Sequence, residues 1–189
     1  MPETLTQQKA DDAQFFERVK AQPVLQETLQ RHALNKLVIR PSQHNSVLGI
    51  TKQEWTLPRL TGQSRSLNVH FEARNRHEFR LELGLDPYIG NVEDKPELFR
   101  ELQPVLAQKT RLLERLRTLL QKATTLPAHV DIVMTGLLAP DKTRAHTIVR
   151  FTGNLPTDPA PEQSARFFAE VIEAIAPMIE TTLAGEIDV

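Results

Sequence analysis

Two apolar clusters in residues 7–35 have the three- and four-residue spacing of a helix: Phe15, Phe16 and Val19, then Val24, Leu25 and Leu29. Pro23 lies between the clusters, and proline is tolerated in the first turn of a helix but not in its interior. This part of the chain therefore predicts two helices that meet at Pro23.

Short apolar runs at 37–39, 47–50 and 55–57 predict strands, separated by the polar, proline-containing loops of residues 41–66. Long loops of this kind often carry function. The only tryptophan, Trp55, lies in this stretch near several basic residues. A core position is its favoured role, and a platform for stacking a nucleic-acid base is the alternative.

Residues 67–85 alternate apolar and polar side chains on both sides of a short polar turn, which predicts a hairpin with one buried and one solvated face. We place a three-residue loop at 75–77. This register sets Arg74 opposite Glu78, Glu72 opposite Arg80, and His70 opposite Glu82. Opposite charges in such pairs stabilise a hairpin by about 0.2–1 kcal/mol each, so these ionic groups already have a structural explanation.

Residues 95–122 carry a wide apolar stripe with helical spacing and predict a long helix, which Pro104 kinks or divides. Residues 129–136 and 145–153 predict a second pair of strands, and residues 162–183 predict a final helix with a kink at Pro177. The order of elements predicts an α+β fold. We expect an antiparallel sheet of at least four strands with a ββαββα core, covered by long helices. Residues 1–36 form a helical arm in this interpretation, and residues 37–189 form the α+β domain, with one continuous domain as the alternative.

Charge is distributed unevenly along the 189 residues, although the net charge is only −1. Residues 31–80 contain nine basic and three acidic residues, whereas residues 151–189 contain one basic and seven acidic residues. The basic part could bind phosphate groups, or the acidic C-terminal part could neutralise it. The absence of cysteine and of a long apolar run predicts a cytoplasmic protein that neither binds nor spans a membrane.

The candidate nucleic-acid surface lies mainly in the basic segment 40–76, with two arginines of the predicted long helix beside it. Its members are Arg40, Lys52, Trp55, Arg59, Arg65, Arg74, Arg76, Arg111 and Arg115. A solvated surface with internal ion pairs is the simpler interpretation of the same residues.

A metal-dependent nuclease is the main catalytic alternative. Asp86, Glu93 and Lys95 resemble the Asp…Glu-x-Lys set of restriction-type nucleases, in which two carboxylates hold Mg²⁺ and the lysine stabilises the attacking hydroxide. However, Glu93 directly precedes a predicted helix, where carboxylates favour the positive end of the helix dipole. We therefore predict no catalytic residue and no metal site here.

Other common chemistries lack their characteristic motifs. The His-x-Glu of His70 and Glu72 resembles part of a zinc deaminase site, but a chain without cysteine cannot supply the thiolates that complete it. No glycine-rich phosphate loop or nucleophile elbow is present. We expect no cofactor.

The order of elements from residue 67 to 183 resembles a little-characterised bacterial domain found beside, or fused to, restriction-endonuclease-like proteins. The likeness rests on the hairpin LNVHFEARNRHEFRLELGL, the segment KPELFRELQPVLAQKTRLLERL, two further strands and the closing segment SARFFAEVIEAIAPMIETTL. The resemblance implies an accessory or recognition role in DNA handling or defence, and it implies no active-site residues.

The sequence thus favours a non-catalytic recognition module of an intracellular bacterial-type DNA-handling or defence system. A protein partner is expected, with nucleic acid as a further ligand of segment 40–76. The metal-dependent nuclease and a self-associating structural protein, which would form a homo-oligomer, remain alternatives.

Overall fold

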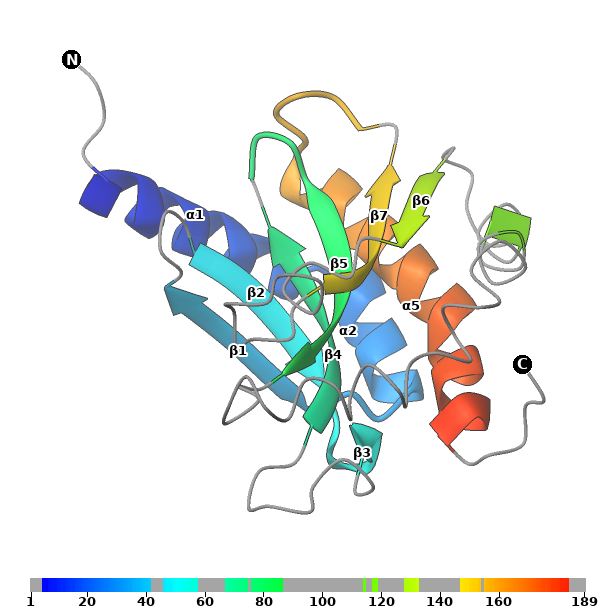
Figure 1. The fold of residues 1–189 in the computed structure, drawn as a ribbon. Coiled ribbons are helices and arrows are strands. Elements are labelled where there is room, and N and C mark those ends of the chain that lie inside the picture. The colour runs from blue at the N-terminus through cyan, green and yellow to red at the C-terminus, as the bar shows by residue number, and fades with distance from the viewer. Residues whose placement is uncertain are drawn as a thin grey trace, which may run out of the picture.

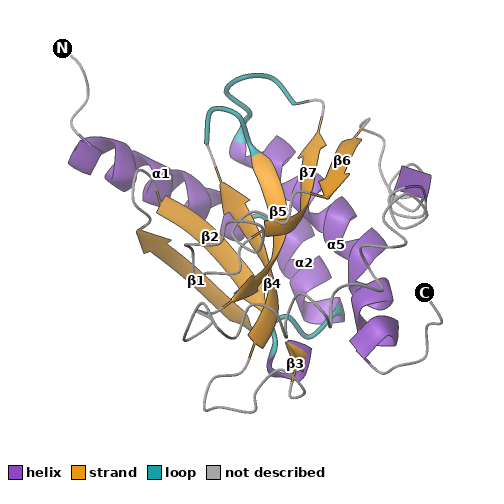
Figure 2. Cartoon of the chain, viewed as in Figure 1, coloured by secondary structure: helices purple, strands orange, loops and turns teal. Residues whose placement is uncertain are grey.

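Three helices pack on one face of an antiparallel sheet in the computed structural model (Figure 1). The structure describes residues 5–41, 46–57, 67–74, 76–86, 114, 117–118, 128–132, 147–153 and 155–183. The helices are α1 (Leu5–Lys20), α2 (Pro23–Arg31) and α5 (Pro161–Leu183), and Figure 2 shows them together behind the strands. The predicted α+β class and antiparallel sheet are confirmed.

Six strands follow one another across the sheet in the order β1-β2-β4-β5-β7-β6. Their bounds are β1 (Lys36–Pro41), β2 (Ser46–Thr51), β4 (Leu67–Arg74), β5 (Arg80–Asp86), β6 (Ala128–Ile132) and β7 (Thr147–Gly153). The short strand β3 (Thr56–Leu57) pairs with the start of β4. Trp55 belongs to a preceding 3₁₀ turn (Gln53–Trp55), so the predicted strand at 55–57 begins one residue later than expected.

The first two helices meet at Pro23, as predicted. Pro23 occupies the start of α2, where its missing N–H removes no helical hydrogen bond. The helix ends in a Schellman turn, because the N–H of Leu34 donates to the carbonyl of Leu29 at 2.8 Å and that of Ala33 to Gln30 at 3.1 Å. Ala33 adopts the left-handed conformation that this turn requires, with φ of 54°.

One hydrophobic core joins the three helices to the sheet. Phe71 lies near its centre, edge-on to Trp55 from one side and to Phe168 of α5 from the other, with ring centroids 5.8 and 6.2 Å apart. Gly153 allows α5 to approach β7 closely, since a Cβ at this position would lie only 2.9 Å from the Phe167 ring. The helices α1 and α2 contribute to the same core through Phe16, Val19, Leu25 and Leu29.

The hairpin β4–β5 is confirmed, but its predicted register is wrong by two residues. Arg74 pairs with Arg80 and Glu72 pairs with Glu82, so five residues, not three, connect the strands. Phe79 leaves the ladder and is buried, with its ring edge-on to Phe15 of α1 at 6.3 Å. A tertiary contact thus decides the register, and it outweighs the weak charge pairs on which the prediction relied.

The final helix α5 is confirmed at the predicted position and continues through Pro177 without a break. The strand β7 forms within its predicted range, β6 begins one residue before its predicted start, and the two pair antiparallel. The predicted long helix at 95–122 lies outside the described residues except for Glu114, Arg117 and Thr118, which are helical. In the described part of the chain, no helix is long and apolar enough to cross a bilayer.

Candidate functional site

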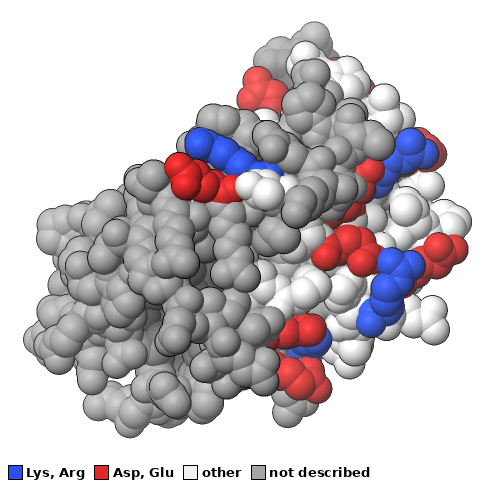
Figure 3. Space-filling view, turned by 90° about the vertical axis from the view of Figure 1, so that its right-hand side faces the viewer, with Lys and Arg blue, Asp and Glu red and all other residues white. Residues whose placement is uncertain are grey.

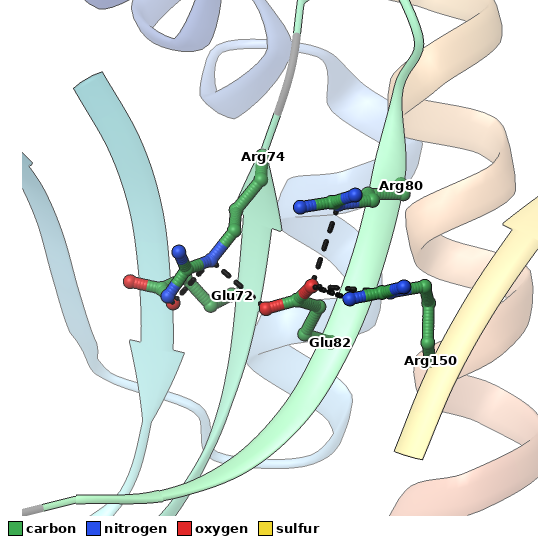
Figure 4. A network of polar contacts seen from close by, with 5 residues as sticks. All are labelled: Glu72, Arg74, Arg80, Glu82 and Arg150. Carbon is green, nitrogen blue, oxygen red and sulfur yellow. Dashed lines mark hydrogen bonds and ion pairs between the residues drawn. The ribbon is translucent and has the colours of Figure 1, made fainter. Parts of the chain in front are cut away.

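Five charged side chains form a network on the sheet face opposite the helices: Glu72, Arg74, Arg80, Glu82 and Arg150 (Figure 4). They come from the three adjacent strands β4, β5 and β7. In the sheet, Glu72 of β4 pairs with Glu82 of β5, and Glu82 pairs with Arg150 of β7. Antiparallel pairing therefore sets two like-charged carboxylates directly opposite each other. The arginines on either side compensate for this repulsion.

Glu82 is the centre of the network. Its Oε2 lies 2.9 Å from Arg74 Nε, and its Oε1 lies 3.3 Å from Arg80 Nε and accepts from Arg150 Nη2 at 3.2 Å. Arg74 Nε also donates to Glu72 at 2.8 Å. Both glutamates are only 3% exposed. The face predicted to be solvated therefore buries its carboxylates, which is a correction to the sequence interpretation.

The charged groups of this network influence one another electrostatically. Burial lowers the pKa of the Arg80 guanidinium, an effect that Glu82 opposes and that Arg150 and Arg74 reinforce. An arginine nevertheless keeps its proton in a protein, so Arg74, Arg80 and Arg150 remain cationic beside the two glutamates. Within the described residues, no group of three or more histidines and carboxylates is arranged to hold a metal ion. The described contacts of the network are ion pairs that join β4, β5 and β7.

A second polar chain links α1 to the β4–β5 loop. Asp12 is buried, accepts a hydrogen bond from the N–H of Ser46, and lies 3.7 Å from Arg76 Nε. Arg76 Nη2 contacts His77 Nε2 at 2.9 Å, and His77 Nδ1 contacts Asp158. Burial raises the pKa of the Asp12 carboxyl, although the N–H of Ser46, Arg76 and His77 act in the opposite direction. These contacts hold the loop against the helix.

A third set of contacts ties α5 to the end of α2 and to the residue after β2. Lys52 is 8% exposed; its Nζ donates to the His32 carbonyl at 3.0 Å, contacts Glu180, and lies 5.4 Å from the centre of the Trp55 ring. His32 Nε2 lies 3.0 Å from Glu173 Oε2, and Arg31 pairs with the same glutamate. These contacts bring acidic residues of the C-terminal helix to basic residues of the middle segment.

The described part of the predicted nucleic-acid surface is therefore largely paired. Lys52, Arg74 and Arg76 each contact a carboxylate, and Trp55 is 1% exposed, so its ring lies in the core rather than open for stacking. Figure 3 likewise shows acidic and basic groups next to one another on the described part of one face. Arg40 lies in β1. Arg59, Arg65, Arg111 and Arg115 lie outside the described residues.

The nuclease set cannot be assembled from the described residues. Asp86 is the last residue of β5, while Glu93 and Lys95 lie outside the described part of the chain.

An open groove lies between α2 and the start of β1, with a volume of about 660 Å³. Its apolar lining includes Leu29, Leu34 and Leu37, and its polar lining consists of Gln26, Glu27, Gln30 and Asn35; Pro23 and Ala33 complete it. The Schellman turn shapes one end of the groove, since both Ala33 and Leu34 belong to it. The apolar part of this lining suits an aliphatic side chain of a binding partner, and the amide groups and the Glu27 carboxylate can bind polar groups beside it.

Sequence reasoning missed several of these contacts, although some carried a signal. Asp12 lies four residues before Phe16 and seven before Val19, so helical periodicity places it on the buried side of α1. Glu173 and Glu180 are seven residues apart and share one side of α5. No local pattern points to Arg150 as the partner of Glu82, because 68 residues separate them.

Comparison of the chain with protein-family models, with curated proteins and with solved structures finds no match.

Proposed function

We propose that this chain is a non-catalytic recognition module that binds a protein partner at the groove between α2 and β1. The observation that carries this proposal is the position of the groove, which opens beside a strand at the margin of the sheet. A groove between a helix and an edge strand is a recurrent site for extended peptides, because backbone hydrogen bonds and side-chain pockets act together there.

The ion pairs support a protein partner more than a nucleic acid. A phosphate track needs lysines and arginines that neutralise phosphates, whereas Lys52, Arg74 and Arg76 already contact carboxylates of this chain. The setting in bacterial DNA handling or defence remains a prediction of the resemblance over residues 67–183. No contact among the described residues favours the nuclease alternative.

Selection from a displayed library of short random peptides tests the proposal. Peptides that bind the purified wild-type chain should lose about tenfold or more in affinity for Gln30→Trp, which places a large ring at the rim of the groove. Gln14→Trp, an equivalent change at an exposed position of α1, should bind the same peptides as the wild type does.

Two results would overturn the proposal: failure to select any peptide, or selected peptides that bind Gln30→Trp and wild type equally. Binding of duplex DNA that falls steeply with salt would instead favour the nucleic-acid function predicted for segment 40–76.

A further inference from the structure

The outer edge of β1 offers backbone groups to another strand. Among the described residues, β1 pairs with β2 alone, at the end of the strand order (Figure 1). A strand in this position has N–H and C=O groups along its free side, which can pair with a further extended segment. Lys36 starts this strand, and charged residues, lysine above all, are common where proteins limit edge-to-edge aggregation.

The two faces of β1 differ in what they would offer to such a segment. Leu37 and Ile39 pack against the core, and Leu37 also lines the groove. Val38 faces the opposite way and is 54% exposed. An added strand would therefore place its side chains of one face at the mouth of the groove, and those of the other face beside Val38.

The charge of β1 selects among the possible occupants. The strand carries Lys36, which is exposed, and Arg40, and it contains no acidic residue. Antiparallel pairing of two copies centred on Val38 would set Lys36 of one copy opposite Arg40 of the other. Like charges in such positions are unfavourable, whereas opposite charges stabilise the pair. A second copy of the chain is thus a poor occupant.

We propose that β1 receives an extended acidic segment of a partner protein as an additional strand of the sheet. Carboxylates of this segment would lie on the face of Lys36, and its aliphatic side chains would enter the groove beside Leu37. The six residues of β1 span about 20 Å, which sets the length of the bound segment at about six residues. This inference rests on the proposed function and assigns the chemistry of its ligand.

Two six-residue peptides, matched in length to β1, test the charge. One alternates aspartate with valine and isoleucine, and the other replaces each aspartate by lysine. Fluorescence anisotropy with labelled peptides at low salt should show that the acidic peptide binds about tenfold or more tightly than the basic one. Lys36→Glu should lower the affinity of the acidic peptide about three- to tenfold and raise the affinity of the basic peptide. Arg18→Glu makes a similar reversal of charge at an exposed position of α1 and should change the affinity of neither peptide.

Methylation of the peptide backbone tests the added strand without any change to the protein. Successive residues of a strand direct their N–H groups to opposite sides. N-methyl groups on one set of alternate residues of the acidic peptide should therefore abolish binding, and those on the other set should leave most of it. Equal loss with both sets, or loss with neither, would contradict strand addition.

The outcomes separate this inference from the function on which it rests. If library peptides bind at the groove but carry no acidic bias, and Lys36→Glu binds them normally, the acidic ligand is wrong while the recognition function stands. If no peptide of either charge binds, both fail. If the chain sediments as a dimer that Val38→Lys returns to a monomer, the occupant of β1 is a second copy and the inference is overturned.

Discussion

Charged side chains are buried and paired at the centre of the sheet, whereas a charged side chain is exposed at its edge. At the centre, Glu72 and Glu82 are buried, and arginines from three strands surround them. At the edge, Lys36 is exposed on a strand with no carboxylate of its own. The difference shows that most of the described basic residues of the middle of the sequence serve contacts within the chain.

Burial makes the removal of one partner more costly at the centre of the sheet than at its edge. A buried carboxylate that loses its partners keeps the full cost of leaving water, whereas an exposed ammonium group is solvated with or without a partner. Substitutions at the centre should therefore change the free energy of unfolding, and those at the edge should change binding.

The largest effect is expected for Glu82→Gln. This change leaves three guanidinium groups without their shared carboxylate in a buried position, and we expect a loss of about 3–5 kcal/mol in the free energy of unfolding, measured by urea denaturation. Glu54→Gln, at an exposed position of the 3₁₀ turn before β3, should change it by about 0.5 kcal/mol or less. Equal effects would show that the network contributes no more than surface charge does.

A double-mutant cycle of Glu82→Gln and Arg150→Met should sharpen this result. The two side chains are in contact across β5 and β7, so their effects on unfolding should be non-additive by about 0.5–3 kcal/mol. Pairing of Glu82→Gln with Arg18→Glu on α1 provides the additive control. Strict additivity in the first cycle would show that the loss of stability in Glu82→Gln does not come from its ion pair with Arg150.

Substitution of Asp12 should have an effect on stability between those at the centre and at the edge of the sheet. Asp12 is buried, but its contact with Arg76 is long, at 3.7 Å. Burial raises the pKa of its carboxyl above the usual 3.8, so the folded state binds the proton more tightly than the unfolded state. Its contribution to stability is therefore present below that value and is lost as pH rises through the raised pKa.

Asp12→Asn should accordingly lose less stability than the wild type as pH rises, because an amide carries no charge that burial penalises. Thermal denaturation of both proteins over a series of pH values would measure this difference. A variant that is less stable than the wild type at every pH would mean that the attraction of Arg76 exceeds the cost of burial.

The smallest effect on folding is expected at the edge. Lys36→Glu and Val38→Thr change exposed positions of β1 and should alter the free energy of unfolding by about 0.5 kcal/mol or less in urea denaturation. Lys36→Glu should nevertheless change peptide affinity. A substantial loss of stability in both variants would show that β1 contributes to folding as the centre of the sheet does, and would contradict the contrast between the two regions.

Local patterns accounted for much of the fold and for little of the candidate site. The helical spacing around Pro23 and the alternation in residues 67–85 predicted α1, α2 and the hairpin, since each pattern reports one buried side of one element. The groove had no such signal. It forms where the end of α2 meets β1 through the Schellman turn at Ala33, and helix packing against the sheet decides that meeting.

The sequence by itself determined the approximate positions of the described helices and of most described strands, because periodicity is a property of neighbouring residues. It also carried the segregation of charge between residues 31–80 and 151–189. Only the tertiary structure decided the hairpin register and the partners of Glu82, Lys52 and Asp12, since these depend on Phe79 reaching Phe15 and on strands and helices distant along the chain. Pair energies of a few tenths of a kcal/mol cannot fix such choices locally, but burial in a shared core can.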